Sequence, residues 1–358
     1  MVFFPYSTFQ NHQGKINMRI VIDAMGTDLR PVPDVAGAMD ALRELPQTPD
    51  IILVGHESAI KNELAKHHPT STEWQRISIV DAPQEILMSD KPAEVIKQKP
   101  ESSIHVGVKL IKDKQADAFI TAGNTGATLA ISMVSASAVG RIKGVKRPAL
   151  AAIPRLWGHT ITVLDVGANT DTKLEWLIEF GLMGNIYSRD VLKVNQPRVG
   201  LLSNGEEEGK GNQLVKDAFE PFKQLPLNFI GNIEPADLIT GKVDVIVCDG
   251  YVGNILIKTF ESSVKKTLYS LKDELTSDVR SKLGAVLARP ALRRMRDKID
   301  PNKFGGAPLL GLNGLVFIGH GSADRVAIAS LVSQAQNAIN ANLIERLEEG
   351  LGLYNGNQ

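Results

Sequence analysis

Short apolar runs alternate with amphipathic segments along the chain from Met18 onward, and nearly every run ends in Gly, Asn or Asp. The runs are rich in β-branched residues and apolar throughout, which is typical of parallel strands covered on both faces. Segments between them, such as 58–66 and 212–224, have helical periodicity. This pattern predicts a three-layer α/β/α fold with a mostly parallel sheet. The runs lie at 18–26, 50–57, 77–83, 116–126, 159–171, 198–209, 227–234, 243–254 and 315–321.

Residues 255–300 break this rhythm, because they form a long helical and basic stretch without a strand-like run. We interpret this stretch as a helical arm that projects from the sheet domain. The run at 315–321 and the helical segment after it predict a further strand and a closing helix. No internal repeat, low-complexity tract or Pro/Ser-rich linker divides the chain. We therefore expect a single α/β/α domain over residues 18–358 that carries the arm.

Composition and charge narrow the classes of function. The 358 residues include 40 Lys plus Arg and 40 Asp plus Glu, so the chain lacks the basic field that non-specific nucleic-acid binding requires. A single Cys excludes an internal disulfide and fits a reducing compartment. No apolar run approaches the roughly 20 residues that cross a bilayer, and residues 1–17 lack the long apolar region of a signal peptide. We expect a cytoplasmic protein that does not bind nucleic acid.

Asparagine and glycine gather in the loops that follow the predicted strands. In a parallel sheet these loops meet at the carboxyl edge, where helix N-termini present free N–H groups to ligands. Turn statistics explain Asn and Gly in any one loop. Five such loops on one edge instead predict neutral donors and close backbone approach, which suit an anion such as phosphate. The asparagines are Asn124, Asn169, Asn204, Asn232 and Asn254.

Known cofactor and metal motifs do not fit the sequence. No G-x-G-x-x-G follows the first strand, and GEEEGKG at 205–211 has the wrong spacing for a Walker loop, with Gly211 where Ser or Thr should follow Lys210. The seven His residues have no acidic or Cys partners at ligand spacing. We expect neither a metal nor a cofactor.

Covalent catalysis is also poorly supported. Cys248 ends an apolar run and is interpreted as a packed core thiol. Ser322 in GHGSAD lacks the spacing of a nucleophile elbow, and the neighbouring His320 has either a structural hydrogen-bonding role or a role in the site. We infer that a substrate supplies the nucleophile.

Lys173 follows the strand-like run VLDVGAN, near the start of a predicted helix. Cations are unfavourable at helix N-termini, because the helix dipole favours negative charge there. This lysine is therefore either solvated and incidental, or it faces an anion that it binds together with the helix.

In order and spacing, these motifs resemble the bacterial phosphate acyltransferase family PlsX. The resemblance covers about residues 18–340 and implies a fold similar to isocitrate dehydrogenase and phosphotransacetylase, a homodimer, and peripheral association with the membrane. Family members begin near MRI, which makes Met18 the expected start and residues 1–17 an expected disordered extension. The motifs are DAMG, AGNTGA, LDVGAN followed by Lys173, GLLSNGEEEGKGN, FIGNIE, DGYVGN, and FGGAPLLGLNG followed by GHGS.

The resemblance also implies the reaction. Family members convert acyl-acyl carrier protein and inorganic phosphate to acyl phosphate and free acyl carrier protein, in phospholipid biosynthesis. The family's active-site Lys and Asn match Lys173 and Asn232, and we expect phosphate to attack the thioester carbonyl directly. The expected substrate-binding residues are Gly123, Asn124, Thr125, Gly126, Asn169, Asn204, Gly205, Lys210, Asp249, Gly250, Asn254 and His320.

Two departures from the family pattern lie in the first loop, where Thr27 and Leu29 replace a usual Gly and a frequent His. If that Gly has positive φ, Thr27 is strained. Two other functions stay open. A coenzyme A-dependent phosphate acyltransferase would share the fold and the anion site, whereas a non-enzymatic scaffold would bind membrane or acyl carrier protein without turnover.

The arm carries a local excess of positive charge, although the chain as a whole has a net charge of zero. Residues 279–298 contain seven basic groups against one acidic group, a local charge of +6, with apolar residues interleaved. This spacing is typical of an amphipathic segment on an anionic surface, although a solvated helical face also fits. Acyl carrier protein and an anionic membrane are the two expected surfaces. The expected contacts are Arg289, Arg293, Arg294 and Arg296.

Overall fold

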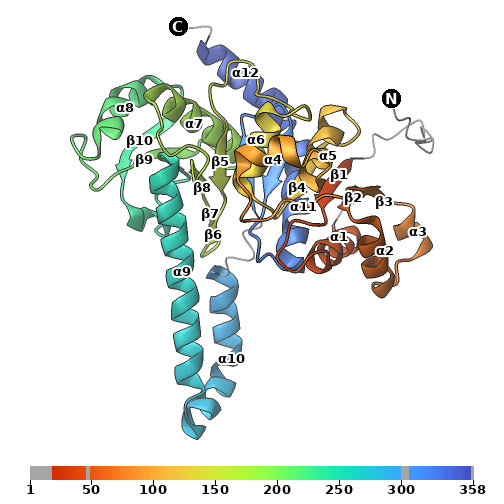
Figure 1. The fold of residues 1–358 in the computed structure, drawn as a ribbon. Coiled ribbons are helices and arrows are strands. Elements are labelled where there is room, and N and C mark those ends of the chain that lie inside the picture. Colours follow the sequence, from red (N-terminus) through yellow and green to blue (C-terminus); the bar gives the residue numbers. More distant parts are fainter. Residues whose placement is uncertain (1–17, 46–48, 300–305, 356–358) are drawn as a thin grey trace.

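The computed structural model describes residues 18–45, 49–299 and 306–355; the extension expected at residues 1–17 lies outside them. In this part of the chain an 11-stranded sheet runs through the domain in the order β10-β9-β11-β8-β5-β12-β13-β4-β1-β2-β3. Helices pack on both faces of the sheet (Figure 1). The predicted three-layer α/β/α fold is therefore confirmed.

Two groups of parallel strands make up most of the sheet. The central residues of the inner strands are buried on both faces, as the continuous apolar runs predict, whereas the two edge strands, β3 and β10, are partly exposed. The first group comprises β1 (Arg19–Asp23), β2 (Asp50–Gly55), β3 (Ile77–Asp81), β4 (Ala118–Thr121) and β13 (Leu315–Ile318). The second comprises β8 (Thr162–Leu164), β9 (Arg198–Leu202), β10 (Asn228–Ile233) and β11 (Val245–Val247).

Two strands that the pattern missed join these groups. β5 (Ala149–Ala152) pairs antiparallel with β8 and with β12 (Ala307–Leu310), and β12 pairs antiparallel with β13. Three successive reversals make the two parallel groups run in opposite directions. The expectation that all five Asn loops lie on one edge is therefore wrong, because Asn124 follows β4 whereas the other four belong to the second group.

The helices cover the sheet by close packing. α1 (Val32–Glu44) lies against α11 (Arg325–Asn340), and a Cβ at Gly37 would come within 2.5 Å of the Ile328 Cβ. α7 (Leu174–Ile186) packs on the second group of strands, between them and α12 (Leu343–Asn355). The remaining elements are α2 (Glu57–Lys66), α3 (Ser71–Trp74), α4 (Pro92–Gln98), β6 (Arg155–Leu156), β7 (His159–Thr160), α5 (Ser103–Lys112), α6 (Thr125–Val134), η1 (Tyr187–Val191), α8 (Gln213–Gln224) and η2 (Pro235–Leu238).

The predicted arm is a helical hairpin that projects from the domain (Figure 1). It consists of α9 (Gly250–Leu275) and α10 (Val279–Ile299), so the first helix begins five residues earlier than expected. Leu283, Val286 and Leu287 on α10 are more than half exposed. None of the described helices combines the length and apolar character that a membrane crossing requires.

The first loop accommodates its departures from the family pattern without strain. Thr27 is not in the left-handed region of φ, so the strain considered for this position is absent. Its hydroxyl donates a hydrogen bond to Asp34 Oδ2 at 2.5 Å inside the domain. Burial raises the pKa of the Asp34 carboxyl to about 7. Leu29 is largely exposed.

Candidate active site

A buried carboxylate organises the loop that follows β8. Asp165 is fully buried, and its two oxygens accept backbone hydrogen bonds from Leu150, Gly167, Ala168 and Asn169 at 2.7–3.1 Å. Burial raises the pKa of this carboxyl, and hydrogen bonds to Ala168 and Asn169 oppose that rise. The Asn169 carboxamide donates to the same carboxylate and to the Pro148 carbonyl. Both of its N–H donors are therefore engaged within the protein.

The start of α9 lies directly on this loop. The Gly250 N–H donates to the Asn169 carbonyl at 2.8 Å, and a Cβ at Gly253 would lie 2.0 Å from the Asp165 carbonyl oxygen. Only glycine permits such a close approach. Asp249 caps the helix by accepting hydrogen bonds from the first-turn amides, and half-buried Asn254 lies against Gly167. The motif DGYVGN thus fixes α9 to the loop.

Lys173 marks the N-terminus of α7. It occupies the N-cap position, no side chain caps this end, and its exposed ammonium lies 5.7 Å from the centroid of the Trp176 ring. The guanidinium of Arg147 lies over the same ring at 5.0 Å. Two cations therefore flank an uncapped helix N-terminus, which favours an anion. The sequence pattern does not indicate Arg147, because this residue precedes β5, a short Ala-rich strand.

The loop at 204–211 is closed by its own hydrogen bonds. Asn204 Oδ1 accepts from the Gly211 N–H at 2.9 Å, and the Asn232 carboxamide donates to the Glu207 carbonyl at 2.8 Å. A Cβ at Gly205 would lie 2.9 Å from Lys210 Cγ. Lys210 is exposed on this loop. The polar residues therefore set the loop's shape.

Asn232 is 4% exposed, and its Oδ1 has no hydrogen-bond partner in the described part of the chain. One of its two amide N–H donors is used by the loop carbonyl, so Asn232 positions the loop and keeps a second donor and its Oδ1 for other partners. Ser203 Oγ, which precedes the same loop, is likewise buried without a partner among these residues.

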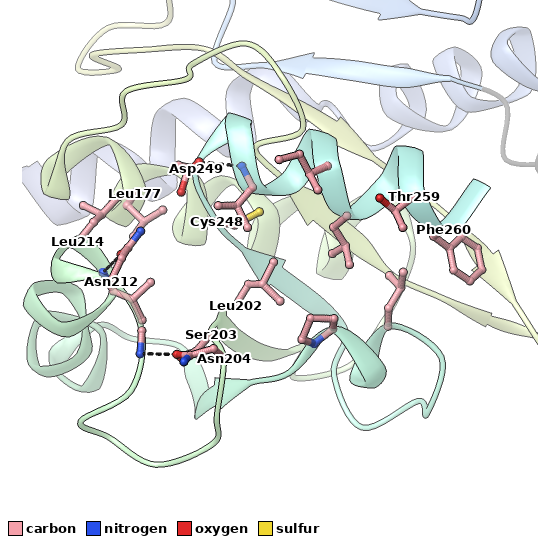
Figure 2. Close-up of a pocket in the computed structure, with 17 residues that line it drawn as sticks. Leu177, Leu202, Ser203, Asn204, Asn212, Leu214, Cys248, Asp249, Thr259 and Phe260 are labelled. Carbon is pink, nitrogen blue, oxygen red and sulfur yellow. Dashed lines mark hydrogen bonds between the residues drawn. The ribbon is translucent and has the colours of Figure 1, made fainter. Parts of the chain in front are cut away.

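A pocket of about 690 Å³ lies beneath the first three turns of α9 (Figure 2). Ser203, Asn204, Asn212 and Asp249 lie toward one end, and Phe260 lies at the other (Figure 2). Lys173 precedes Leu177, a lining residue, by one turn of α7. The lining is completed by Leu202, Gly211, Leu214, Val215, Pro235, Leu238, Cys248, Val252, Ile255, Leu256 and Thr259.

Cys248 lies in the wall of this pocket as a buried thiol. It is 3% exposed, and its sulfur contacts the Asp165 carbonyl at 3.4 Å. Burial raises the pKa of the thiol, which disfavours the nucleophilic thiolate. The interpretation of Cys248 as a packed core thiol is confirmed. In the described ranges, no three His, Cys, Asp or Glu residues group as metal ligands would.

Asn124 belongs to the opposite edge of the sheet. It caps α6 through the Ala127 N–H and donates to the carbonyls of Leu87, Met88 and Asp90 at 3.0–3.3 Å. Its polar atoms are thus engaged in joining two segments. Gly123, Thr125 and Gly126 adjoin it, so they follow β4 at the same edge of the sheet.

His320 follows β13 at that same edge. It is exposed and pairs with Ser322 Oγ at 2.8 Å. It lies near Glu261 of α9, which is eleven residues beyond Gly250 and seven beyond Asn254, or about 16 Å and 10 Å along a helix. Strand direction therefore places His320 and the Asn124 loop at the opposite edge of the sheet from the ends of β8, β9 and β10, which Lys173, Asn204 and Asn232 adjoin.

Comparisons with known proteins agree with this architecture. Residues 18–346 match the model of a family described as fatty acid synthesis protein. The chain is 45% identical to the phosphate acyltransferase of Acidobacterium capsulatum over 92% of this chain and 96% of that protein. It is 43% identical to the phosphate acyltransferase of Desulforudis audaxviator over 94% and 96%. A phosphotransacetylase structure from Streptococcus pyogenes shares the fold, with a TM-score of 0.56 and 16% identity over 90% of this chain and 94% of that one.

Proposed function

The chain belongs to the fatty acid synthesis protein family, its similar relatives are phosphate acyltransferases, and on this premise we propose that it transfers an acyl group from acyl carrier protein to inorganic phosphate. The products are the free carrier thiol and an acyl phosphate. The acyl phosphate is used in phospholipid biosynthesis. The observation that carries the proposal is the pair of cations at the uncapped start of α7, one turn from an apolar pocket.

Phosphate binds in this account at the N-terminus of α7. Lys173 and Arg147 supply positive charge, and the backbone N–H groups at the start of α7, which no side chain caps, supply donors. The Trp176 ring attracts both cations, which favours positions close to this helix N-terminus. Asn204 and Lys210, from the loop at 204–211, and Asn254, from the start of α9, are further donors.

The bound phosphate acts as the nucleophile. One of its oxygens attacks the thioester carbonyl carbon, the new C–O bond forms, and the C–S bond breaks to release the carrier's phosphopantetheine thiolate, which takes a proton from solvent. Holding the two reactants together can supply up to roughly 7–11 kcal/mol of the barrier reduction. Lys173 offsets the charge that develops on the carbonyl oxygen. Asn232 acts as a positioning residue through the Glu207 carbonyl.

The arm provides the contact with larger partners. Arg289, Arg293 and Arg294 on α10 are exposed. Val286 and Leu287 expose apolar side chains between these arginines and the turn that joins α9 to α10. This combination suits the acidic surface of acyl carrier protein or an anionic membrane. We propose peripheral association of a cytoplasmic homodimer, with the arm as the membrane or carrier contact.

Three substrates distinguish the proposal from its alternatives. The purified protein would be given phosphate with hexadecanoyl-acyl carrier protein, hexadecanoyl-coenzyme A or acetyl-coenzyme A, and acyl phosphate would be measured. The proposal predicts the highest kcat/KM with the carrier-bound chain. Preference for acetyl-coenzyme A would support the coenzyme A-dependent alternative, and carrier binding without acyl phosphate would support the scaffold.

A further inference from the structure

The pocket beneath α9 is longer and more apolar than a phosphate site requires. From Val252 to Phe260 its helical wall covers nine residues, a rise of about 12 Å along the helix. The opposite wall comes from β9 and η2 and is formed by Leu202, Pro235 and Leu238. No Lys or Arg lines the pocket, and its volume of about 690 Å³ is typical of a small-molecule site.

Ser203 gives this apolar space a polar end. It is 8% exposed, it lines the pocket, and its Oγ has no hydrogen-bond partner in the described residues. An unpaired buried hydroxyl costs free energy, so a ligand atom that accepts its proton is favoured. Asp249 is the charged residue of the lining, and its Oδ1 caps α9 by accepting backbone hydrogen bonds. Its negative charge repels the carboxylate of a free fatty acid at this end of the pocket. A neutral acyl thioester is therefore favoured over a free fatty acid.

We propose that this pocket holds the acyl chain of the thioester, with the carbonyl at Ser203 and the methyl end toward Phe260. The inference rests on the proposed function, because the acyl substrate is taken from it. The Ser203 hydroxyl donates to the carbonyl oxygen, and Lys173 lies one helical turn beyond the lining residue Leu177, at the phosphate side. Leu256 and Phe260 limit the length of chain that the pocket accepts.

Two substitutions on α9 test the chain position. Leu256→Trp fills the middle of the pocket, and each methylene that it displaces should reduce kcat/KM about fourfold. We expect a loss of at least tenfold with hexadecanoyl-acyl carrier protein and little change with hexanoyl-acyl carrier protein. Phe260→Ala should shift the preference toward octadecanoyl chains. Leu268→Trp and Tyr269→Ala are matched controls on the same helix outside the pocket, and they should keep the wild-type profile.

Ser203→Ala tests the orientation. It should lower kcat at least tenfold. The loss should be about the same for every chain length, because the carbonyl is common to all substrates. A change in the chain-length profile instead would place Ser203 along the chain and overturn the proposed direction. An unchanged kcat in the folded variant would also overturn it.

A binding measurement separates this inference from the proposed function. The probe is the amide analogue of hexadecanoyl pantetheine, measured by calorimetry with wild type, Leu256→Trp and Leu268→Trp, with circular dichroism and urea midpoints to confirm folding. If Leu256→Trp weakens binding and Leu268→Trp does not, the result supports the pocket. This holds even if the wild-type protein makes no acyl phosphate. Equal binding by all three proteins, or an unchanged chain-length profile in an active Leu256→Trp enzyme, overturns the acyl pocket.

Discussion

The ammonium of Lys173 lies 5.7 Å from the centre of the Trp176 ring, within the first turn of α7. Lys173→Met keeps the aliphatic stem against this ring but removes the charge at the uncapped helix N-terminus. We expect an intact fold and a loss of roughly 100-fold in kcat, which persists at saturating phosphate if the charge acts in the transition state. Lys216→Met, on α8, is the control. Near-normal kcat would remove Lys173 from the mechanism, and a rise in phosphate KM alone would assign it to ground-state binding.

Asn232→Ala should release the loop at 204–211, because it removes the hydrogen bond to the Glu207 carbonyl. The lost bond costs about 0.5–1.5 kcal/mol of stability. We expect a larger effect on kcat than on the urea midpoint, because the loop carries Asn204 and Lys210. A folded variant with wild-type kcat would show that the loop's position does not matter for turnover.

Gly253→Ala should destabilise the junction between α9 and the Asp165 loop. The added Cβ would lie 2.0 Å from the Asp165 carbonyl oxygen, and overpacking of this kind typically costs about 1–3 kcal/mol, or more where backbone must move. Gly284→Ala, in α10 with no atom within 4 Å of the new Cβ, should be neutral or stabilise by up to about 1 kcal/mol. Thermal unfolding of both variants checks this contrast. Equal effects would mean that the close approach at Gly253 is relieved without cost.

The Asp34 carboxyl gives stability a specific pH dependence. Its pKa is 3.8 in the unfolded reference and about 7 in the folded protein, chiefly because of burial. Between these values the folded state binds the extra proton, so this group's stabilisation is complete below pH 3.8 and is lost as pH rises through about 7. The loss is at most about 1.4 kcal/mol per pH unit.

Asp34→Asn should therefore become more stable relative to wild type as pH rises toward 8. Urea denaturation of both proteins over this range isolates the contribution of Asp34, since the other titrating groups are shared. A constant difference between the two proteins at all pH values would contradict the raised pKa.

Arg293→Glu with Arg294→Glu should weaken binding to acyl carrier protein or to anionic liposomes while sparing the fold. Both side chains are exposed on α10, and each basic residue near an anionic membrane contributes about 1 kcal/mol. Rising salt should mimic the substitutions in wild type. The KM for carrier and co-sedimentation with liposomes distinguish the two surfaces. If both measurements stay unchanged, the arm is a solvated or dimer-packing helix.

The alternation of apolar runs and helical segments was sufficient to predict the parallel strands and the arm. It did not identify β5 and β12, because ALAA and APLL are short and contain Ala or Pro in place of β-branched residues. These two strands reverse the direction of the sheet, so missing them placed Asn124 and His320 on the same edge as Lys173. Strand polarity depends on pairing, which a local pattern does not contain.

The candidate site was predicted in part for a similar reason. Motifs identified Lys173 and the asparagine loops, whereas the engagement of Asn169 and Asn232 by neighbouring carbonyls depends on contacts between distant segments. Arg147 reaches Lys173 only through the shared Trp176 ring, 29 residues later in the chain. Ser203 became a candidate through its burial without a partner, a property that sequence does not display.

The central claim is direct attack of phosphate on the carrier thioester, and product stoichiometry tests it most directly. Acyl carrier protein thioester would be incubated with isotopically labelled phosphate, and free carrier thiol and acyl phosphate would be measured together, with Lys173→Met in parallel. The account predicts one labelled acyl phosphate for each thiol released, no release without phosphate, and little of either product with the variant. Thiol release without acyl phosphate, or at the same rate without phosphate, would contradict it.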